Sequence, residues 1–166
     1  MLKYSLIVFA LLIPLPDFAS DSPAQPSIEI YMPSPCLACI DWGGYLAENG
    51  FKVVYKATTD MAAVKKRLKV PKALESTHTA VVRGYFVEGH AHAEDIHELL
   101  RDSPKARGIT VPGLPRGAPG LELSNPTCET ACTMLDNDSG QREVRREIHR
   151  TLLVKHDGST SNWARH

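Results

Sequence analysis

The sequence predicts an α/β sandwich, in which a mixed central β-sheet is flanked by helices and is followed by a Pro/Gly-rich loop and a C-terminal strand. Three observations predict this class. Polar and apolar residues alternate over 27–31, which is the period of a half-buried strand. Apolar residues then recur at helical spacing over 36–47, before a second strand-like run at 51–55. Arg83-Gly84 separates two further apolar runs, which is the signal of a two-residue hairpin.

The first half of the sheet is expected to be a β-α-β unit with a right-handed crossover. Pro35 fits the first turn of the first helix, and Asn49-Gly50 predicts its C-terminal end. Thr59 or Asp60 can cap a second helix that runs to position 68. We expect that helix to carry three basic residues on its solvent-facing side, namely Lys65, Lys66 and Arg67.

The second half is expected to contain a hairpin, a helix and a late strand. Strands at 79–82 and 85–87 flank the hairpin turn, and 94–101 has helical periodicity. The stretch 103–125 is rich in proline and glycine, so we expect turns and loops there. A strand at 151–154 follows, and Asp157-Gly158 is expected to turn the chain into a short tail strand near His166. This order, with two cysteines opening the first helix, is that of a thioredoxin-like sandwich.

The N-terminal segment is expected to be a signal peptide over 1–24, which leaves a single domain over 25–166. Its apolar run over 6–15 is too short for a hydrocarbon core that needs about 20 helical residues. Ser22-Pro23-Ala24 places small residues at the −3 and −1 positions of a cleavage site. An uncleaved membrane anchor is the alternative, and Pro14 and Pro16 argue against it because they interrupt the run.

Charge excludes one class of partner. Lysine plus arginine and aspartate plus glutamate both number 19, so the formal net charge is zero. Nucleic-acid binding depends on a basic surface that neutralises phosphates, and this chain has no basic block. We therefore expect no nucleic-acid partner.

Four cysteines form two close pairs, Cys36/Cys39 and Cys128/Cys132. Spacings of three and four residues put both sulfurs of a pair on one helix face. A helix N-terminus lowers the pKa of a thiol, so reduced Cys36 is expected to be largely thiolate, the form that binds metal or attacks a disulfide. Cys39 and Cys128 are 89 positions apart, too far for a sequence-local zinc ribbon. Two short-loop disulfides remain the alternative in an exported protein.

Histidine and methionine side chains add candidate ligands. His78 precedes the third strand, in a loop that lies beside the cysteine pair in a thioredoxin-like topology. His90 and His92 are expected on one side of an extended segment, either as ligands or as a solvated turn. Met32 offers a soft thioether but equally fits the core.

A set of residues spread over 28–122 and, more loosely, over the final strand matches the pattern of a known family. These residues are Cys36, Cys39, Trp42, Gly50-Phe51, Val70-Pro71, Leu74, His78-Thr79-Ala80-Val81-Val82, Gly84-Tyr85, Val87-Glu88-Gly89-His90, Asp95-Ile96, Leu99-Leu100, Val111-Pro112-Gly113 and Pro119-Gly120. The resemblance is to the CopG family of periplasmic copper-resistance proteins, a thioredoxin-like group distinct from the repressors that share the name. It implies copper binding, and the second cysteine pair resembles the variant in which two cysteine pairs hold the metal.

The chain also departs from the family pattern. Many relatives carry cysteine where this chain has Ala38 and Thr77, and methionine where it has Leu114 and Leu121. Soft ligands available to those relatives are absent here, so no metal-binding role is assigned to these four positions.

The resulting leading hypothesis is an exported, periplasmic copper-binding protein of copper resistance. Cu(I) is favoured because thiolates select it, although zinc also suits thiolates. The candidate ligands are Cys36, Cys39, Cys128, Cys132 and His78. The expected partners are copper ions and other periplasmic copper-handling proteins, without stable membrane insertion after signal cleavage.

Two other classes stay open. A thiol-disulfide oxidoreductase would use Cys36 as the attacking and Cys39 as the resolving thiol, but the sequence before the third strand lacks the proline such enzymes place there. A binding module would hold structural disulfides or a four-cysteine zinc ion. Coupling of thiol oxidation to copper redox change would make the protein an enzyme, and this too stays open.

Overall fold

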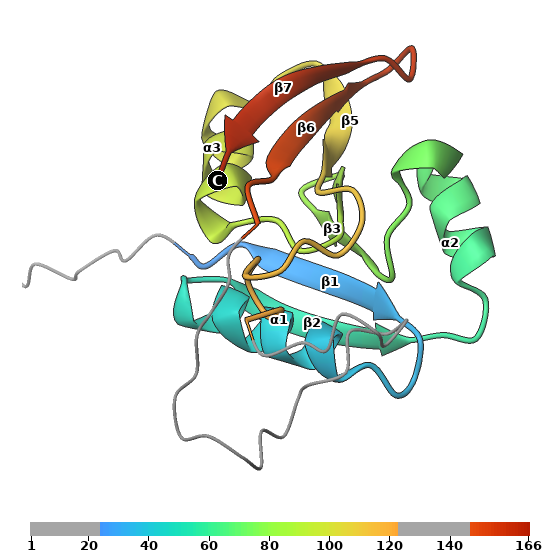
Figure 1. Cartoon of the computed structure of the whole chain (residues 1–166), viewed down its shortest axis with the longest axis vertical. Helices are drawn as coiled ribbons and strands as arrows, with labels where there is room; N and C mark the ends of the chain where they lie inside the picture. The colour runs from blue at the N-terminus through green and yellow to red at the C-terminus, as the bar shows by residue number, and fades with distance from the viewer. Residues whose placement is uncertain (1–23, 123–146) are drawn as a thin grey trace, which may run out of the picture.

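A seven-stranded mixed β-sheet forms the centre of the computed structural model, which describes residues 24–122 and 147–166 (Figure 1). The strand order is β2-β1-β3-β4-β5-β6-β7. The strands are β1 (Ser27–Met32), β2 (Lys52–Ala57), β3 (Thr79–Val82), β4 (Tyr85–Glu88), β5 (Ala106–Thr110), β6 (Arg150–Lys155) and β7 (Thr160–Arg165). The helices are α1 (Leu37–Glu48), α2 (Met61–Leu68), the 3-10 turn η1 (Lys72–Leu74) and α3 (Ala93–Asp102). The predicted sandwich is confirmed.

The predicted β-α-β unit forms as expected. Strands β1 and β2 are connected by α1 and pair in parallel, with Ile28 opposite Val53. Cys36 is the N-cap residue of α1, so the predicted position of the cysteine pair at a helix N-terminus is confirmed. The β3–β4 hairpin turns at Arg83-Gly84, where both residues have positive φ.

One strand is missing from the prediction. Residues 106–110 were expected to be loop, but they form β5, which pairs in parallel with β4 and antiparallel with β6. The strand is short, and Gly108 presents no side chain to an apolar pattern. Gly108 lies directly against the backbone of Phe86, where a Cβ atom would collide with the carbonyl oxygen. Close backbone approach of this kind is a typical reason for glycine inside a strand.

Helices cover both faces of the sheet. Alternate residues of β1 and β3, among them Ile30 and Ala80, join the buried core around Trp42 of α1 and Ile96 of α3. The opposite face carries Thr79 and Glu88, which contact Lys65 of α2. The first face therefore packs against α1 and α3, and the second against α2.

The expected exposure of Lys65 is wrong. Its side chain is 5% exposed, because the α2 turn that carries it lies on the sheet and places the ammonium group against Glu88. Lys66 and Arg67 are exposed as expected. One lysine of this basic run is therefore buried, because its partner, Glu88, lies on the distant strand β4.

The C-terminal hairpin completes the sheet. Strand β6 includes the predicted 151–154 run, and the tail strand β7 follows a turn at Asp157-Gly158, with Gly158 at positive φ. Figure 1 shows this hairpin beside α3. Within residues 24–122 and 147–166, the helices are too short or too polar to cross a membrane.

Candidate functional site

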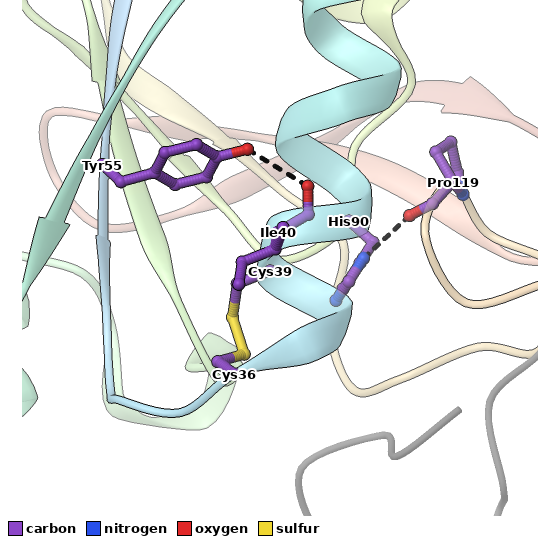
Figure 2. Close-up of a disulfide and its surroundings, with 6 residues drawn as sticks. All are labelled: Cys36, Cys39, Ile40, Tyr55, His90 and Pro119. Carbon is purple, nitrogen blue, oxygen red and sulfur yellow. Dashed lines mark hydrogen bonds between the residues drawn. A yellow bond between two sulfur atoms is a disulfide. The ribbon is translucent and has the colours of Figure 1, made fainter. Parts of the chain in front are cut away.

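A disulfide between Cys36 and Cys39 occupies the first turn of α1 (Figure 2). Both residues are buried. The Cys36 carbonyl oxygen accepts a hydrogen bond from the Ile40 amide at 3.2 Å, and the Tyr55 hydroxyl donates to the Ile40 carbonyl at 3.1 Å. The turn that carries the sulfurs is thereby fixed to both α1 and β2. The thiolate expected of Cys36 concerns the reduced pair, whereas this structure holds the oxidised one.

Two buried imidazoles meet beside Trp42, one turn further along α1. The ring centroids of His78 and His90 lie 4.7 Å apart, and the Trp42 ring lies 4.6 Å from His78 and 6.2 Å from His90. The Trp42 indole nitrogen donates to the Ala91 carbonyl at 2.9 Å, which fixes the segment after His90. Both imidazoles are fully buried. The structure therefore brings His78, and with it His90, to the helix that bears the cysteine pair.

The ring nitrogens of these histidines are poorly satisfied. Nδ1 of His90 lies 2.8 Å from the Pro119 carbonyl oxygen, as Figure 2 shows. A carbonyl only accepts, so this nitrogen donates, and Nε2 of a neutral ring keeps its lone pair. In the part of the chain that the structure describes, that Nε2 and both ring nitrogens of His78 have no hydrogen-bond partner. Buried polar atoms without partners are rare and often mark a functional site.

Burial holds both imidazoles in the neutral form. It lowers the pKa of His78 well below its usual value, and the neighbouring His90 imidazole and the Lys65 ammonium group act in the same direction. The nearby Gly89 backbone acts in the opposite direction and raises the pKa of His78, although its contact with the ring does not have the geometry of a hydrogen bond. Burial likewise lowers the pKa of His90 to about 4, with the Pro119 carbonyl opposing. Neutral imidazole is the form that binds metal ions.

Protonation of His90 is expected to make the fold acid-sensitive. Below its ordinary value of 6.5, the unfolded chain binds a proton at His90 that the folded protein excludes until about pH 4. Stability therefore falls as the pH drops across this interval, by about 3 kcal/mol for this residue. Urea unfolding at several pH values measures it. His90→Gln should show a correspondingly shallower acid loss, whereas His156→Gln, at an exposed histidine, should match the wild type. Identical pH slopes in all three proteins would contradict this assignment.

The Pro/Gly-rich loop after β5 covers α1. Gly120 approaches the α1 backbone so closely that a Cβ atom would lie 2.6 Å from the Trp42 amide nitrogen. Ala38 packs in one apolar cluster with Leu114 and Leu121. These are three of the four positions where the chain departs from the family pattern. The structure thus joins them into an apolar contact next to Cys39.

The remaining sequence candidates lie elsewhere. Cys128 and Cys132 fall outside the described residues. Met32 is buried in the core at the end of β1. His90 and His92 were expected on one side of an extended segment, but they contact different rings: His90 faces His78, and His92 stacks on His166. Gly89 has a φ of 76°, and the Ala91 amide bonds back to its carbonyl, so the segment is a turn.

Comparison with solved structures identifies the family. A structure entitled "Copper resistance protein copG- Form 1" shares 36% sequence identity and a TM-score of 0.69, covering 84% of this chain and 96% of that one. The chain belongs to the CopG family. A second CopG structure, "Form 2", shares 35% identity and a TM-score of 0.68, covering 85% of this chain and 98% of that one.

Further comparisons locate the family signature within the chain. A family model described as "Protein of unknown function, DUF411" matches residues 74–121. That stretch contains His78, His90 and the loop over α1, but begins after Cys36 and Cys39. No curated protein matches the chain. Across 24–122 and 147–166, no group of three or more His, Cys, Asp or Glu side chains is already arranged to hold a metal ion.

Proposed function

We propose that this CopG-family protein is an exported copper-binding protein of copper resistance. It holds Cu(I) on thiolates of Cys36, Cys39, Cys128 and Cys132, with His78 as a nitrogen ligand. The observation that carries the proposal is that one helix, α1, bears two sulfurs in its first turn and, one turn further along at Trp42, contacts buried imidazoles whose nitrogens have no partner among the described residues. Thiolates and imidazoles are the donors that copper prefers in proteins.

The redox state of the Cys36–Cys39 pair would control copper binding. A disulfide has no thiolate to donate, so the oxidised pair does not bind copper. A dithiol reductant supplies two electrons and two protons, which break the S–S bond and yield two thiols. Deprotonation then leaves two thiolates at the helix N-terminus, where their charge is favoured. In this proposal reduction loads the site. Exchange with an oxidised dithiol partner reverses it: the partner's disulfide takes up the two electrons and leaves as two thiolates, the Cys36–Cys39 bond forms again, and Cu(I) is released.

The chain path allows the second cysteine pair to reach this site. Leu121 packs against Ala38, which directly precedes Cys39. Cys128 follows Leu121 by seven positions, enough to span about 25 Å at full extension. After the second cysteine pair, the Glu147 amide donates to the Arg116 carbonyl at 2.9 Å, so residue 147 lies next to the same Pro/Gly-rich loop. These contacts support a site shared by both pairs.

Changing Cys128 and Cys132 together to serine is expected to lower both the stoichiometry and the affinity of Cu(I) binding. An ion held by two thiolates is more exposed to solvent and oxidant than one enclosed by four. Anaerobic titration of the reduced protein against a competing Cu(I) chelator measures this, with circular dichroism to verify folding. A Thr127→Ala/Thr133→Ala variant alters the same segment and keeps every sulfur. Full binding at unchanged affinity in the serine variant would show that the second pair is a structural disulfide.

Export is expected to remove the first 24 residues. The short apolar run and the small residues at the expected cleavage site support a mature N-terminus near Gln25. Intact mass of the protein recovered from the periplasm measures it. Ala24→Phe should block cleavage there, whereas Ala19→Phe should leave it unchanged. A full-length mass for the wild type would indicate a membrane tether instead.

The residues before β3 make a thiol-disulfide oxidoreductase the second candidate. Thioredoxin-type oxidoreductases place a proline beside the active-site cysteines at this point, and this chain has Ser76-Thr77-His78 instead. Insulin reduction by the mature protein without copper separates the two functions, because rapid turnover that requires Cys39 would favour the oxidoreductase.

A further inference from the structure

A second group of histidines lies where α3 meets the C-terminal hairpin. His92 precedes α3, His149 precedes β6 and His166 follows β7. Their ring centroids lie 3.7 Å apart for His92 and His166, 5.3 Å for His149 and His166, and 5.5 Å for His92 and His149. Three segments distant in sequence thus bring three imidazoles together. This cluster contains none of the ligands proposed for Cu(I).

Two of these histidines form a cross-strand pair. The His149 amide donates to the His166 carbonyl at 3.1 Å, and the His166 amide donates to the His149 carbonyl at 3.0 Å. Residues opposite each other in an antiparallel ladder have Cβ atoms about 4.5–5.5 Å apart. Their imidazoles are therefore held at a separation that one ion can bridge.

Hydrogen bonds determine which nitrogen of His149 and which nitrogen of His166 keeps a lone pair. Nε2 of His166 lies 2.8 Å from an Asp95 carboxylate oxygen, and Nδ1 of His149 lies 3.0 Å from the Glu147 carbonyl oxygen. These oxygens only accept, so both nitrogens donate. In the neutral rings, the lone pairs are left on Nδ1 of His166 and Nε2 of His149. That Nε2 is buried and has no hydrogen-bond partner within the described residues.

The same pattern is typical of metal-binding histidines. A ligating imidazole usually donates its second N–H to a carboxylate or a backbone carbonyl, which fixes the tautomer and makes the other nitrogen more basic. His166 has the carboxylate and His149 the carbonyl. Thr151 also donates to the Asp95 oxygen that accepts from His166, which holds the carboxylate in place. Imidazole suits divalent copper, nickel and zinc, and Cu(II) binds most tightly in this series.

We propose that His149 and His166 form a second, nitrogen-based site for a divalent transition-metal ion, Cu(II) foremost, with His92 as the third ligand. The His92 and His166 rings are stacked with an interplanar angle of 7°, so their in-plane lone pairs lie in parallel planes and do not converge on one point. Binding of all three therefore requires one of these two rings to rotate about its side-chain bonds. The site stands independently of the Cu(I) proposal, because it uses no sulfur.

Cu(II) titration of the mature protein tests this site. The cysteines are kept oxidised, and a thiol assay verifies that no free thiol remains, so the sulfur site is silent. Electron paramagnetic resonance should show nitrogen coordination at one equivalent of Cu(II). Loss of a supporting partner alone costs about 10- to 100-fold in metal affinity, so His149→Asn should lose at least about tenfold. His156→Asn removes a histidine from the same hairpin outside the cluster and should bind like the wild type.

A measurement on the unaltered protein guards against variants that fail to fold. Substoichiometric Cu(II) should broaden the imidazole proton resonances of His92, His149 and His166 before those of His97 and His156. Selective broadening of the three supports the proposal. Uniform broadening of all histidines, an absence of nitrogen coordination, or equal affinity in the wild type and His149→Asn would overturn it. Cu(I) titration of the reduced protein is separate, so either proposal can fail alone.

Discussion

Replacing Cys36 and Cys39 together with serine is expected to lower the affinity for Cu(I) by more than about 100-fold. The loss of a ligand's supporting hydrogen bond already costs about 10- to 100-fold, and this variant removes two ligands outright. A serine hydroxyl is a hard donor that stays protonated at neutral pH, so it does not replace a soft thiolate for Cu(I). Anaerobic competition with a chromogenic Cu(I) chelator measures the change.

Loss of the cross-link itself is expected to cost little stability, and circular dichroism verifies that the variant folds. The disulfide closes a loop of four residues, and the chain-entropy effect of such a short loop stays below the about 3 kcal/mol of a 15-residue loop. Leu37→Ser is the matched control, since it places serine in the same turn at an exposed position and keeps both sulfurs. Unchanged Cu(I) affinity in a folded Cys36→Ser/Cys39→Ser protein would remove the first cysteine pair from the site.

The sequence predicts the part of the site that depends on local signals. Spacing places Cys36 and Cys39 in the first turn of a helix, and the element order places His78 beside that helix. The first expectation depends on a pattern within a few residues, and the second on the order of the elements along the chain. The metal ligands on Cys128 and Cys132 stay a prediction, because those residues lie outside the described part.

Other contacts between distant segments were not predictable. The divergence of His90 and His92 depends on the turn at Gly89, which packs so closely on the chain just after β5 that a Cβ atom would lie 2.5 Å from the Val111 carbonyl oxygen. Strand β5 itself depends on pairing with β4 rather than on its own pattern. Helical periodicity likewise predicts which side of α2 is apolar, but it does not predict that Lys65 forms an ion pair with the Glu88 carboxylate on β4.

The buried Lys65–Glu88 pair organises the two segments that carry the buried imidazoles. The Glu88 carboxylate accepts hydrogen bonds from Lys65, the Thr79 hydroxyl and the Ser76 amide. Ser76 and Thr79 flank His78, and Glu88 lies two residues before His90. Burial raises the pKa of Glu88, and Lys65 together with the other two donors opposes that rise. The network therefore offsets part of the cost of burying a carboxylate in this region.

Lys65→Met is accordingly expected to destabilise the protein by about 3–5 kcal/mol, the usual cost of leaving a buried charge without its partner. The Glu88 side chain is fully buried, so water does not replace the lost ammonium group. Urea unfolding at pH 7 measures the change. Lys66→Met, which removes the exposed neighbouring lysine, should change stability by less than about 0.5 kcal/mol.

The double variant Lys65→Met/Glu88→Leu separates the charge from the packing. Replacing both members of a buried ion pair with apolar residues of similar volume is often neutral or stabilising, so stability should return most of the way to the wild-type value. The hydrogen bonds that tie Ser76 and Thr79 to Glu88 would still be missing. The double variant should therefore fold while holding His78 less firmly, and its Cu(I) affinity should stay below that of Lys66→Met. Equal stability of Lys65→Met and the wild type would mean that the ion pair does not form in solution.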